Sequence, residues 1–202
     1  MTVFDELLSH PDVREDVELR SRFGFMAFHG GLEGGTEIVA RQAADRAGAS
    51  VYTVVQPATL VWHIPSSLVR AEHSERLSRF LDHVEVVVAV HGYGRPTRPG
   101  QVLLGGGNRA LARHLAGHLR TSIDGFDVVD ELEAIPPELR GLHPDNPVNR
   151  ARSGGVQLEL PPRVRGASPS PRDRGRPCVP DGGLIDALAA AALTWAYDRP
   201  PA

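Results

Sequence analysis

Two apolar segments of this chain end in the same dipeptide, His-Gly, and no other feature constrains the fold as strongly. The first segment occupies residues 23–30 and contains His29, and the second occupies residues 84–92 and contains His91. Short runs that are almost continuously apolar are typical of strands in a parallel sheet that helices cover on both faces. The carboxyl ends of neighbouring parallel strands lie at one edge of the sheet, so the pattern predicts that the two imidazole groups meet there.

The segments around these two strands predict an α/β fold with helices on both faces of the sheet. Thr36 is suited to cap a helix over residues 37–47, and Gly48 is suited to end it. Their β-branched and apolar content predicts further strands at residues 51–55, 60–62, 101–104, 126–129 and 156–160. The spacing of apolar residues predicts further helices, with Asp181 capping the last, at residues 4–8, 67–83, 108–119 and 184–197.

Length and composition limit the organisation of the chain and its partners. The 202 residues suffice for a single domain spanning residues 1–202, in which residues 161–180, rich in proline, serine and arginine, are expected to form a mobile loop. The net charge of −3 gives no overall attraction to nucleic acid or to an anionic membrane, so we expect neither as a partner. No signal peptide or transmembrane segment is apparent, which favours a cytoplasmic location. The sequence does not indicate an oligomeric state.

His29, Glu33 and His91 predict a metal site at the edge of the sheet. Two histidines and a carboxylate on strand ends, with a fourth position open to water, match the ligand set of catalytic zinc (Zn2+). Such a site needs another carboxylate to move protons, and Glu159, near the end of a later apolar strand, is the candidate. The alternative for each histidine alone is a packing role, and the alternative for Glu159 is exposure to solvent. Glu37 is expected to lie in the first turn of the helix over residues 37–47, where its charge favours the helix macrodipole.

Two further motifs offer weaker signals. Asn149 and Arg150 together present donors for a substrate carboxylate, and an exposed arginine without a specific role is the ordinary alternative. The glycines at 105–107 predict a close turn from strand to helix, with a phosphate cradle as the alternative. They lack the ending of a P-loop and the spacing of the dinucleotide fingerprint. The single cysteine, Cys178, falls in the expected mobile segment and is a poor candidate for a nucleophile.

Several motifs in a fixed order resemble the poly-γ-glutamate hydrolase family. They are His29-Gly-Gly-Leu-Glu33-Gly-Gly-Thr36-Glu37, Trp62-His63-Ile64-Pro65-Ser66, Val90-His91-Gly92, Gly105-Gly106-Gly107-Asn108, His143-Pro144-Asp145-Asn146-Pro147-Val148-Asn149-Arg150 and Gly155-Val156-Gln157-Leu158-Glu159-Leu160. The resemblance covers about residues 20–165 of the chain. Each motif alone is weak, and their order and spacing together are more specific than any one of them.

The resemblance implies a three-layer α/β/α fold, related to zinc carboxypeptidases, with a central sheet that is mostly parallel or mixed. It implies a bacterial or phage zinc-dependent hydrolase whose substrate is an anionic γ-glutamyl polymer or peptide, cleaved at its γ-glutamyl amide bonds. On this resemblance His29, Glu33 and His91 look like the zinc ligands, and Glu159 looks like the general acid/base. The dipeptide at 149–150 is similar to the pair that binds the substrate carboxylate in carboxypeptidases.

The chain departs from the family pattern between His29 and Glu33. Family members usually carry one more residue there, and a proline at the position of Gly34, so Glu33 is expected to approach a metal differently. Two alternative functions are a non-catalytic descendant that binds a ligand or partner, and a nucleotide-binding protein that uses the glycines at 105–107. The first predicts that Glu159→Gln leaves the biological activity intact, and the second predicts thermal stabilisation by a nucleotide.

Overall fold

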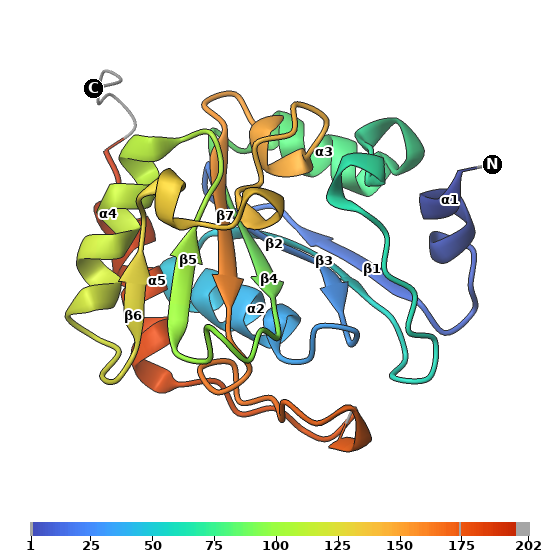
Figure 1. Cartoon of the computed structure of the whole chain (residues 1–202). Helices are drawn as coiled ribbons and strands as arrows, with labels where there is room; N and C mark the ends of the chain where they lie inside the picture. The colour runs from blue at the N-terminus through green and yellow to red at the C-terminus, as the bar shows by residue number, and fades with distance from the viewer. Residues whose placement is uncertain (1, 174, 197–202) are drawn as a thin grey trace.

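The computed structural model describes residues 2–173 and 175–196, and its strands form one seven-stranded sheet. In chain order the strands are β1 (Arg14–Glu18), β2 (Phe23–Gly30), β3 (Ser50–Val55), β4 (Val86–Gly92), β5 (Gln101–Leu104), β6 (Asp127–Val129) and β7 (Gly155–Leu160). Their spatial order is β1-β3-β2-β4-β7-β5-β6 (Figure 1). Strands β3, β2, β4 and β7 run parallel, whereas β1 is antiparallel to β3 and β5 is antiparallel to β7. The expectation of a mixed, mostly parallel sheet is therefore confirmed.

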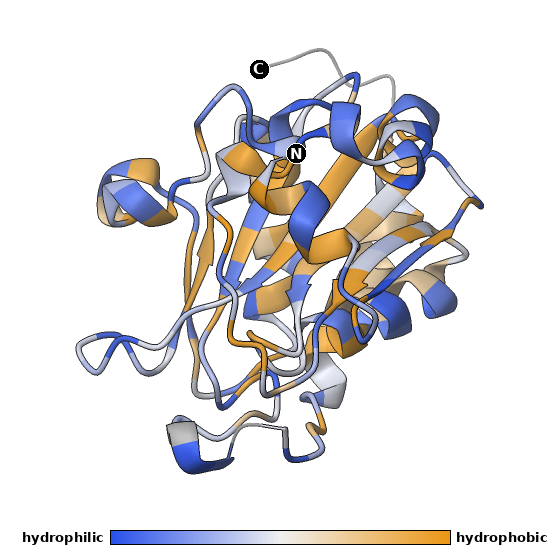
Figure 2. Cartoon of the chain, turned by 90° about the vertical axis from the view of Figure 1, so that its right-hand side faces the viewer, coloured by the Kyte–Doolittle hydropathy of each residue, from blue (hydrophilic) through white to orange (hydrophobic). Residues whose placement is uncertain are grey.

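Helices cover both faces of this sheet. They are α1 (Val3–Leu8), α2 (Thr36–Ala47), α3 (Glu75–His83), α4 (Arg109–Arg120) and α5 (Gly182–Thr194). Helices α2, α4 and α5 share one hydrophobic core with the sheet, and α1 and α3 share a second core on the opposite face. Figure 2 shows the hydrophobic residues concentrated along the strands between these layers. The α/β fold predicted from the sequence is confirmed.

Strand β4 shows why the apolar runs are so continuous. Val86, Val88 and Val90 belong to the core beneath α2, α4 and α5, whereas Val87 and Ala89 belong to the core beneath α3. Alternate side chains of a strand point to opposite faces, so a strand with a core on each side needs apolar residues at every position. The structure thus confirms that β4 is buried on both faces.

Two expectations about secondary structure were wrong, and one strand lies where none was predicted. Residues 60–62 form no strand, because the Gln56 side chain holds both the N–H and the carbonyl of Trp62, at 2.8 and 2.9 Å, and closes a loop. The helix expected over residues 67–83 begins only at Glu75, where the Ser74 hydroxyl caps it by accepting the Leu77 N–H at 2.9 Å. The charged segment at 14–18 forms the edge strand β1, which has the alternating exposure of a half-solvated strand.

Most helix ends follow the sequence. Gly48 ends α2 at φ +61°, and Asp181 caps α5 by accepting the N–H groups of Gly183 and Leu184. Thr36 does not cap α2 as expected: it is the first residue of the helix, and the N-cap is Gly35, at φ +90°. Helix α5 ends at Thr194, and Tyr197, expected within it, lies outside the described residues.

The proline- and arginine-rich segment over residues 161–180 is partly packed. Val164 and Arg165 are buried at its start, and a 3-10 turn spans Pro171–Asp173. Its mobility stays a prediction, as does the assignment of the whole chain to one domain. No helix among the described residues has the length and apolar character to cross a bilayer. The cytoplasmic location stays a prediction.

Candidate functional site

The carboxyl end of β2 places His29 and Glu33 side by side. A single turn, in which the Glu33 N–H bonds the His29 carbonyl at 2.9 Å, brings the two side chains together. The turn depends on Gly31, at φ +77°, where a Cβ atom would lie only 1.9 Å from the Gln56 carbonyl oxygen. As a result, Oε1 of Glu33 lies 2.9 Å from Nδ1 of His29.

His91 reaches the same place from the neighbouring strand β4. The ring centroids of His29 and His91 are 5.1 Å apart, and the edge of one phenylalanine ring, Phe28, contacts both imidazoles. Oε2 of Glu33 lies 3.5 Å from Nδ1 of His91 and accepts the N–H of Gly92 at 2.8 Å. The structure therefore brings together the three residues that the sequence predicted as metal ligands.

A fourth residue, His63, also belongs to this cluster. One ligand atom from each of His29, Glu33 and His63 lies within 4.8 Å of the others, and the His29 and His63 rings are 4.8 Å apart. His63 comes from the loop that the Gln56 side chain closes, next to Ile64, whose carbonyl lies 2.8 Å from Nε2 of His29. His63 stands in one of the motifs that carry the family resemblance, but no pattern in the sequence assigned it a role.

The cluster fits a divalent metal ion. Nε2 of His91 is buried and has no hydrogen-bond partner among the described residues. Buried polar atoms are normally satisfied, so an unpaired buried imidazole nitrogen needs an explanation. Imidazole and carboxylate groups are the ligands of catalytic zinc sites. Among the described residues, His29, Glu33 and His63 have ligand atoms close enough to one another to hold such an ion, and His91 adds a further imidazole next to Glu33.

The charges of the cluster are strongly coupled. Burial alone would raise the pKa of the Glu33 carboxyl, but the charges and hydrogen bonds of His29 and His91 outweigh it and hold the pKa far below its ordinary range. Burial would likewise lower the pKa of His91, and the hydrogen bond and charge of Glu33 outweigh it and raise the pKa. For His63, burial and the neighbouring His29 lower the pKa. Glu33 therefore remains a carboxylate among imidazoles.

Glu159 lies on β7 directly across from His91 in the strand register. Its side chain is buried, and burial, with the nearby charge of Glu33, raises the pKa of its carboxyl despite the opposing effects of His91 and Gln157. Gln157 donates to Oε1 of Glu159 at 2.8 Å and accepts from the Asn146 side chain at 2.7 Å. A buried carboxyl with a raised pKa, held in a defined position, is suited to general acid/base chemistry.

Comparison with known proteins decides the family. The sequence matches the family model described as poly-gamma-glutamate hydrolase over residues 4–168. The chain belongs to the poly-gamma-glutamate hydrolase family. The resemblance inferred from the sequence motifs is therefore confirmed. None of the curated proteins compared with the chain matches it in sequence.

Solved structures support the fold of this family member. A bacteriophage poly-gamma-glutamate hydrolase superposes with a TM-score of 0.70 at 23% identity, covering 90% of this chain and 86% of that one. YNDL in an apo, zinc-free form superposes with a TM-score of 0.69 at 25% identity, covering 89% and 87%.

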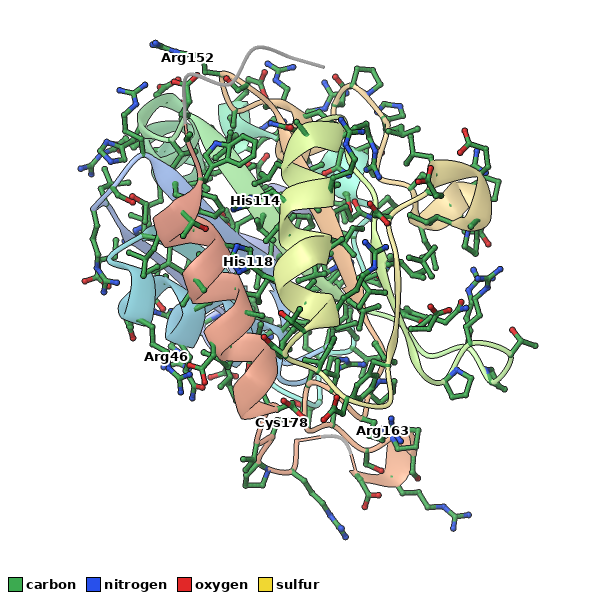
Figure 3. The ribbon with its side chains drawn as sticks, turned by 90° about the vertical axis from the view of Figure 1, so that its left-hand side faces the viewer. Arg46, His114, His118, Arg152, Arg163 and Cys178 are labelled. Atoms are coloured by element: carbon green, nitrogen blue, oxygen red, sulfur yellow. The ribbon has the colours of Figure 1, made fainter. Side chains whose placement is uncertain are left out.

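The other predicted binding pair, Asn149 and Arg150, lies elsewhere in this member of the family. Both residues precede the start of β7, whereas Glu159 lies near its end, and the Asn149 side chain bonds the backbone of Gly107, Gly141 and His143. Figure 3 shows Arg152 at one end of the molecule and Arg163 and Cys178 at the other. The structure does not bring this pair together with the histidine cluster, and its role in binding substrate stays a prediction.

The glycine-rich turn after β5 lies at that same far end. Gly106 has φ +85°, and a Cβ atom there would lie 2.4 Å from the Gly155 carbonyl oxygen. Asn108 then caps α4 by accepting the Leu111 N–H at 2.9 Å. A close turn from strand to helix, packed against the start of β7, accounts for these glycines, as the preferred interpretation of the sequence stated.

Proposed function

We propose that the chain is a zinc-dependent hydrolase of γ-glutamyl amide bonds in poly-γ-glutamate or γ-glutamyl peptides. The observation that carries this proposal is the buried cluster of His29, Glu33 and His91, with Glu159 opposite His91 on the adjoining strand. Membership of a hydrolase family supports the reaction class, and a structural neighbour described as zinc-free makes zinc the metal to test. The anionic substrate follows from the family description.

His29 and Glu33 would hold the metal together with one further histidine. His91 is the favoured third ligand because it is buried and its Nδ1 lies 3.5 Å from Oε2 of Glu33, whereas His63 is exposed. Gly92 orients Glu33 through its N–H, so the carboxylate is fixed between the two strands. When bound, zinc would polarise the scissile carbonyl and make a water molecule more acidic.

Glu159 would carry the proton during hydrolysis. The attacking water loses a proton and the departing amine gains one, so a single carboxylate can accept the first and deliver it to the amine nitrogen. Burial raises the pKa of Glu159, which brings proton uptake and release closer to neutral pH. The hydrogen bond from Gln157 holds one oxygen, Oε1, and leaves Oε2 for the substrate.

Metal content of the purified chain and its histidine variants tests this proposal. We expect about one zinc per chain by elemental mass spectrometry, lost in His29→Ala and His91→Ala and retained in His63→Ala. Glu159→Gln should keep the zinc and lower kcat for γ-glutamyl peptides by roughly 10²- to 10⁴-fold. Circular dichroism confirms that each variant folds.

Three results would contradict parts of this scheme. Absence of zinc from the wild-type chain, even after zinc is added, would remove the metal-dependent mechanism. Loss of zinc in His63→Ala but not in His91→Ala would identify His63, rather than His91, as the third ligand. Unchanged kcat in Glu159→Gln would show that another group carries the proton.

A further inference from the structure

A buried arginine, Arg165, packs against the residue that follows the candidate metal ligand His91. Arg165 is 7% exposed, and its guanidinium packs against Gly92, where a Cβ atom would lie 2.6 Å from Cζ. The N–H of Gly92 is the group that holds Glu33. Only glycine leaves room for this contact, so the guanidinium packs against the residue that follows His91 in the chain.

The charge of Arg165 lacks a close counter-ion among the described residues. Its hydrogen bonds go to two neutral acceptors, the carbonyls of Leu160, at 3.3 Å, and of Gly34. Its Nη2 forms no hydrogen bond with any described group, and Glu33, Glu159 and Glu37 act on it only over longer distances. Buried charges are normally paired, and a guanidinium stays protonated in proteins. A buried guanidinium of this kind is suited to bind a carboxylate.

Arg165 also lines a cavity large enough for part of a substrate. The cavity measures about 430 Å³ and lies between the turn that carries Glu33 and the segment after β7. Two of its charged residues, Arg176 and Asp173, pair with each other at 3.1 Å. No side chain caps the amino end of α2 at Gly35, which also lines the cavity. The other acidic residue that lines the cavity is Glu37. Its carboxylate would repel an anionic ligand, so such a ligand would lie closer to Arg165.

We propose that Arg165 binds the free α-carboxylate of a γ-linked glutamyl unit in this cavity. The inference rests on the proposed function, because it names the part of the substrate that the same site recognises. In a γ-linked polymer every unit has one free α-carboxylate next to the amide bond, whereas an α-linked chain uses that carboxyl in the amide itself. A fixed guanidinium that packs against the residue following His91 can therefore distinguish the two linkages, and its planar fork matches a carboxylate.

Binding of matched ligands tests the role of Arg165. We would titrate γ-linked triglutamate, and the same peptide with its α-carboxyl groups amidated, into the zinc-loaded Glu159→Gln chain by isothermal calorimetry. Removing the α-carboxylates should weaken binding to this chain about 10- to 100-fold, the usual range for hydrogen bonds to charged groups. Adding Arg165→Gln should weaken binding of the triglutamate by a similar factor and abolish the preference between the two ligands.

Two further variants control this experiment. Arg163→Gln removes an exposed charge two residues away and should leave both affinities unchanged. Arg165→Lys keeps the charge without the fork and should retain part of the preference. If Arg165→Gln fails to fold, the two ligands with the lysine variant still decide the question.

Equal binding of both ligands to the parent chain would overturn the role of Arg165. So would loss of the preference in Arg150→Gln rather than in Arg165→Gln. If the preference depends on Arg165 but the wild-type chain cleaves no γ-glutamyl bond, the binding inference stands and the hydrolase proposal fails. If the chain cleaves such bonds but binds both ligands equally well, the hydrolase proposal stands and the binding inference fails.

Discussion

Replacing Gln157 by leucine should weaken both the fold and the candidate active site. Gln157 is 5% exposed and forms the central link of a buried chain that runs from Asn146 to Glu159. Leucine has a similar size but cannot form hydrogen bonds, so the Asn146 amide and one Glu159 oxygen lose their partner. Each buried polar group left unsatisfied costs about 1–3 kcal/mol. We expect the free energy of unfolding to fall by about 2–4 kcal/mol after the gain in apolar packing.

A double-mutant cycle in urea measures this effect. The wild-type chain, Asn146→Leu, Gln157→Leu and the double variant should show a coupling energy of about 1–2 kcal/mol, because either single substitution already breaks the bond between the two side chains. Gln42→Leu, at an exposed glutamine of α2, is the matched control and should change the stability by less than about 0.5 kcal/mol. Additive effects of Asn146→Leu and Gln157→Leu would refute the reasoning.

The same substitution should also affect catalysis. Glu159 without Gln157 keeps its carboxyl group but loses the contact that fixes one oxygen. A positioning loss of this kind appears mainly in kcat, where we expect a decrease of roughly tenfold or more, with KM little changed. A decrease confined to KM would mean that Gln157 acts on substrate binding rather than on Glu159.

Two further predictions concern stability alone. Burial raises the pKa of the Tyr93 hydroxyl to about 12. The unfolded chain gives up this proton near pH 10, so the contribution to stability is complete below pH 10 and is lost as the pH rises to 12; denaturation of Tyr93→Phe at pH 9–11 should show a shallower decline. At Gly24 a Cβ atom would lie 2.7 Å from Cζ of Phe80, so Gly24→Ala should cost about 1–3 kcal/mol by calorimetry. Gly117→Ala in α4, which meets no atom within 4 Å, should be neutral or stabilising.

The predictable parts of the structure are those that depend on short stretches of sequence. The run at 86–90 is apolar at every position because both faces of β4 are buried, and that alone identifies it as an interior strand. Asp181 marks the start of α5 and Gly48 the end of α2 through local hydrogen bonds and backbone conformation. The meeting of His29 and His91 needed one further assumption, that the strands are parallel neighbours, and β2 and β4 fulfil it.

The parts that escaped prediction depend on the direction of distant strands. Arg150 precedes Glu159 by nine residues, which suggests proximity, but β7 runs the whole depth of the sheet between them. Strand β5 returns antiparallel to β7, so the glycines at 105–107 also lie at the far edge. Arg165 lies in a segment whose composition indicates a loop, and no local pattern reveals that its guanidinium turns back beneath Gly92.

The short spacing between His29 and Glu33 shows how local and distant constraints combine at this site. Four residues are just enough for one helical turn, so the Glu33 carboxylate faces His29 without any help from the rest of the fold. Its second oxygen, however, accepts the N–H of Gly92, which belongs to another strand. The carboxylate is thereby fixed between two histidines that are 62 positions apart in the numbering. Because Glu33 joins β2 to β4 in this way, the geometry of the whole cluster depends on the parallel pairing of these two strands, and any change that shifts their register would separate the candidate ligands without altering one of them.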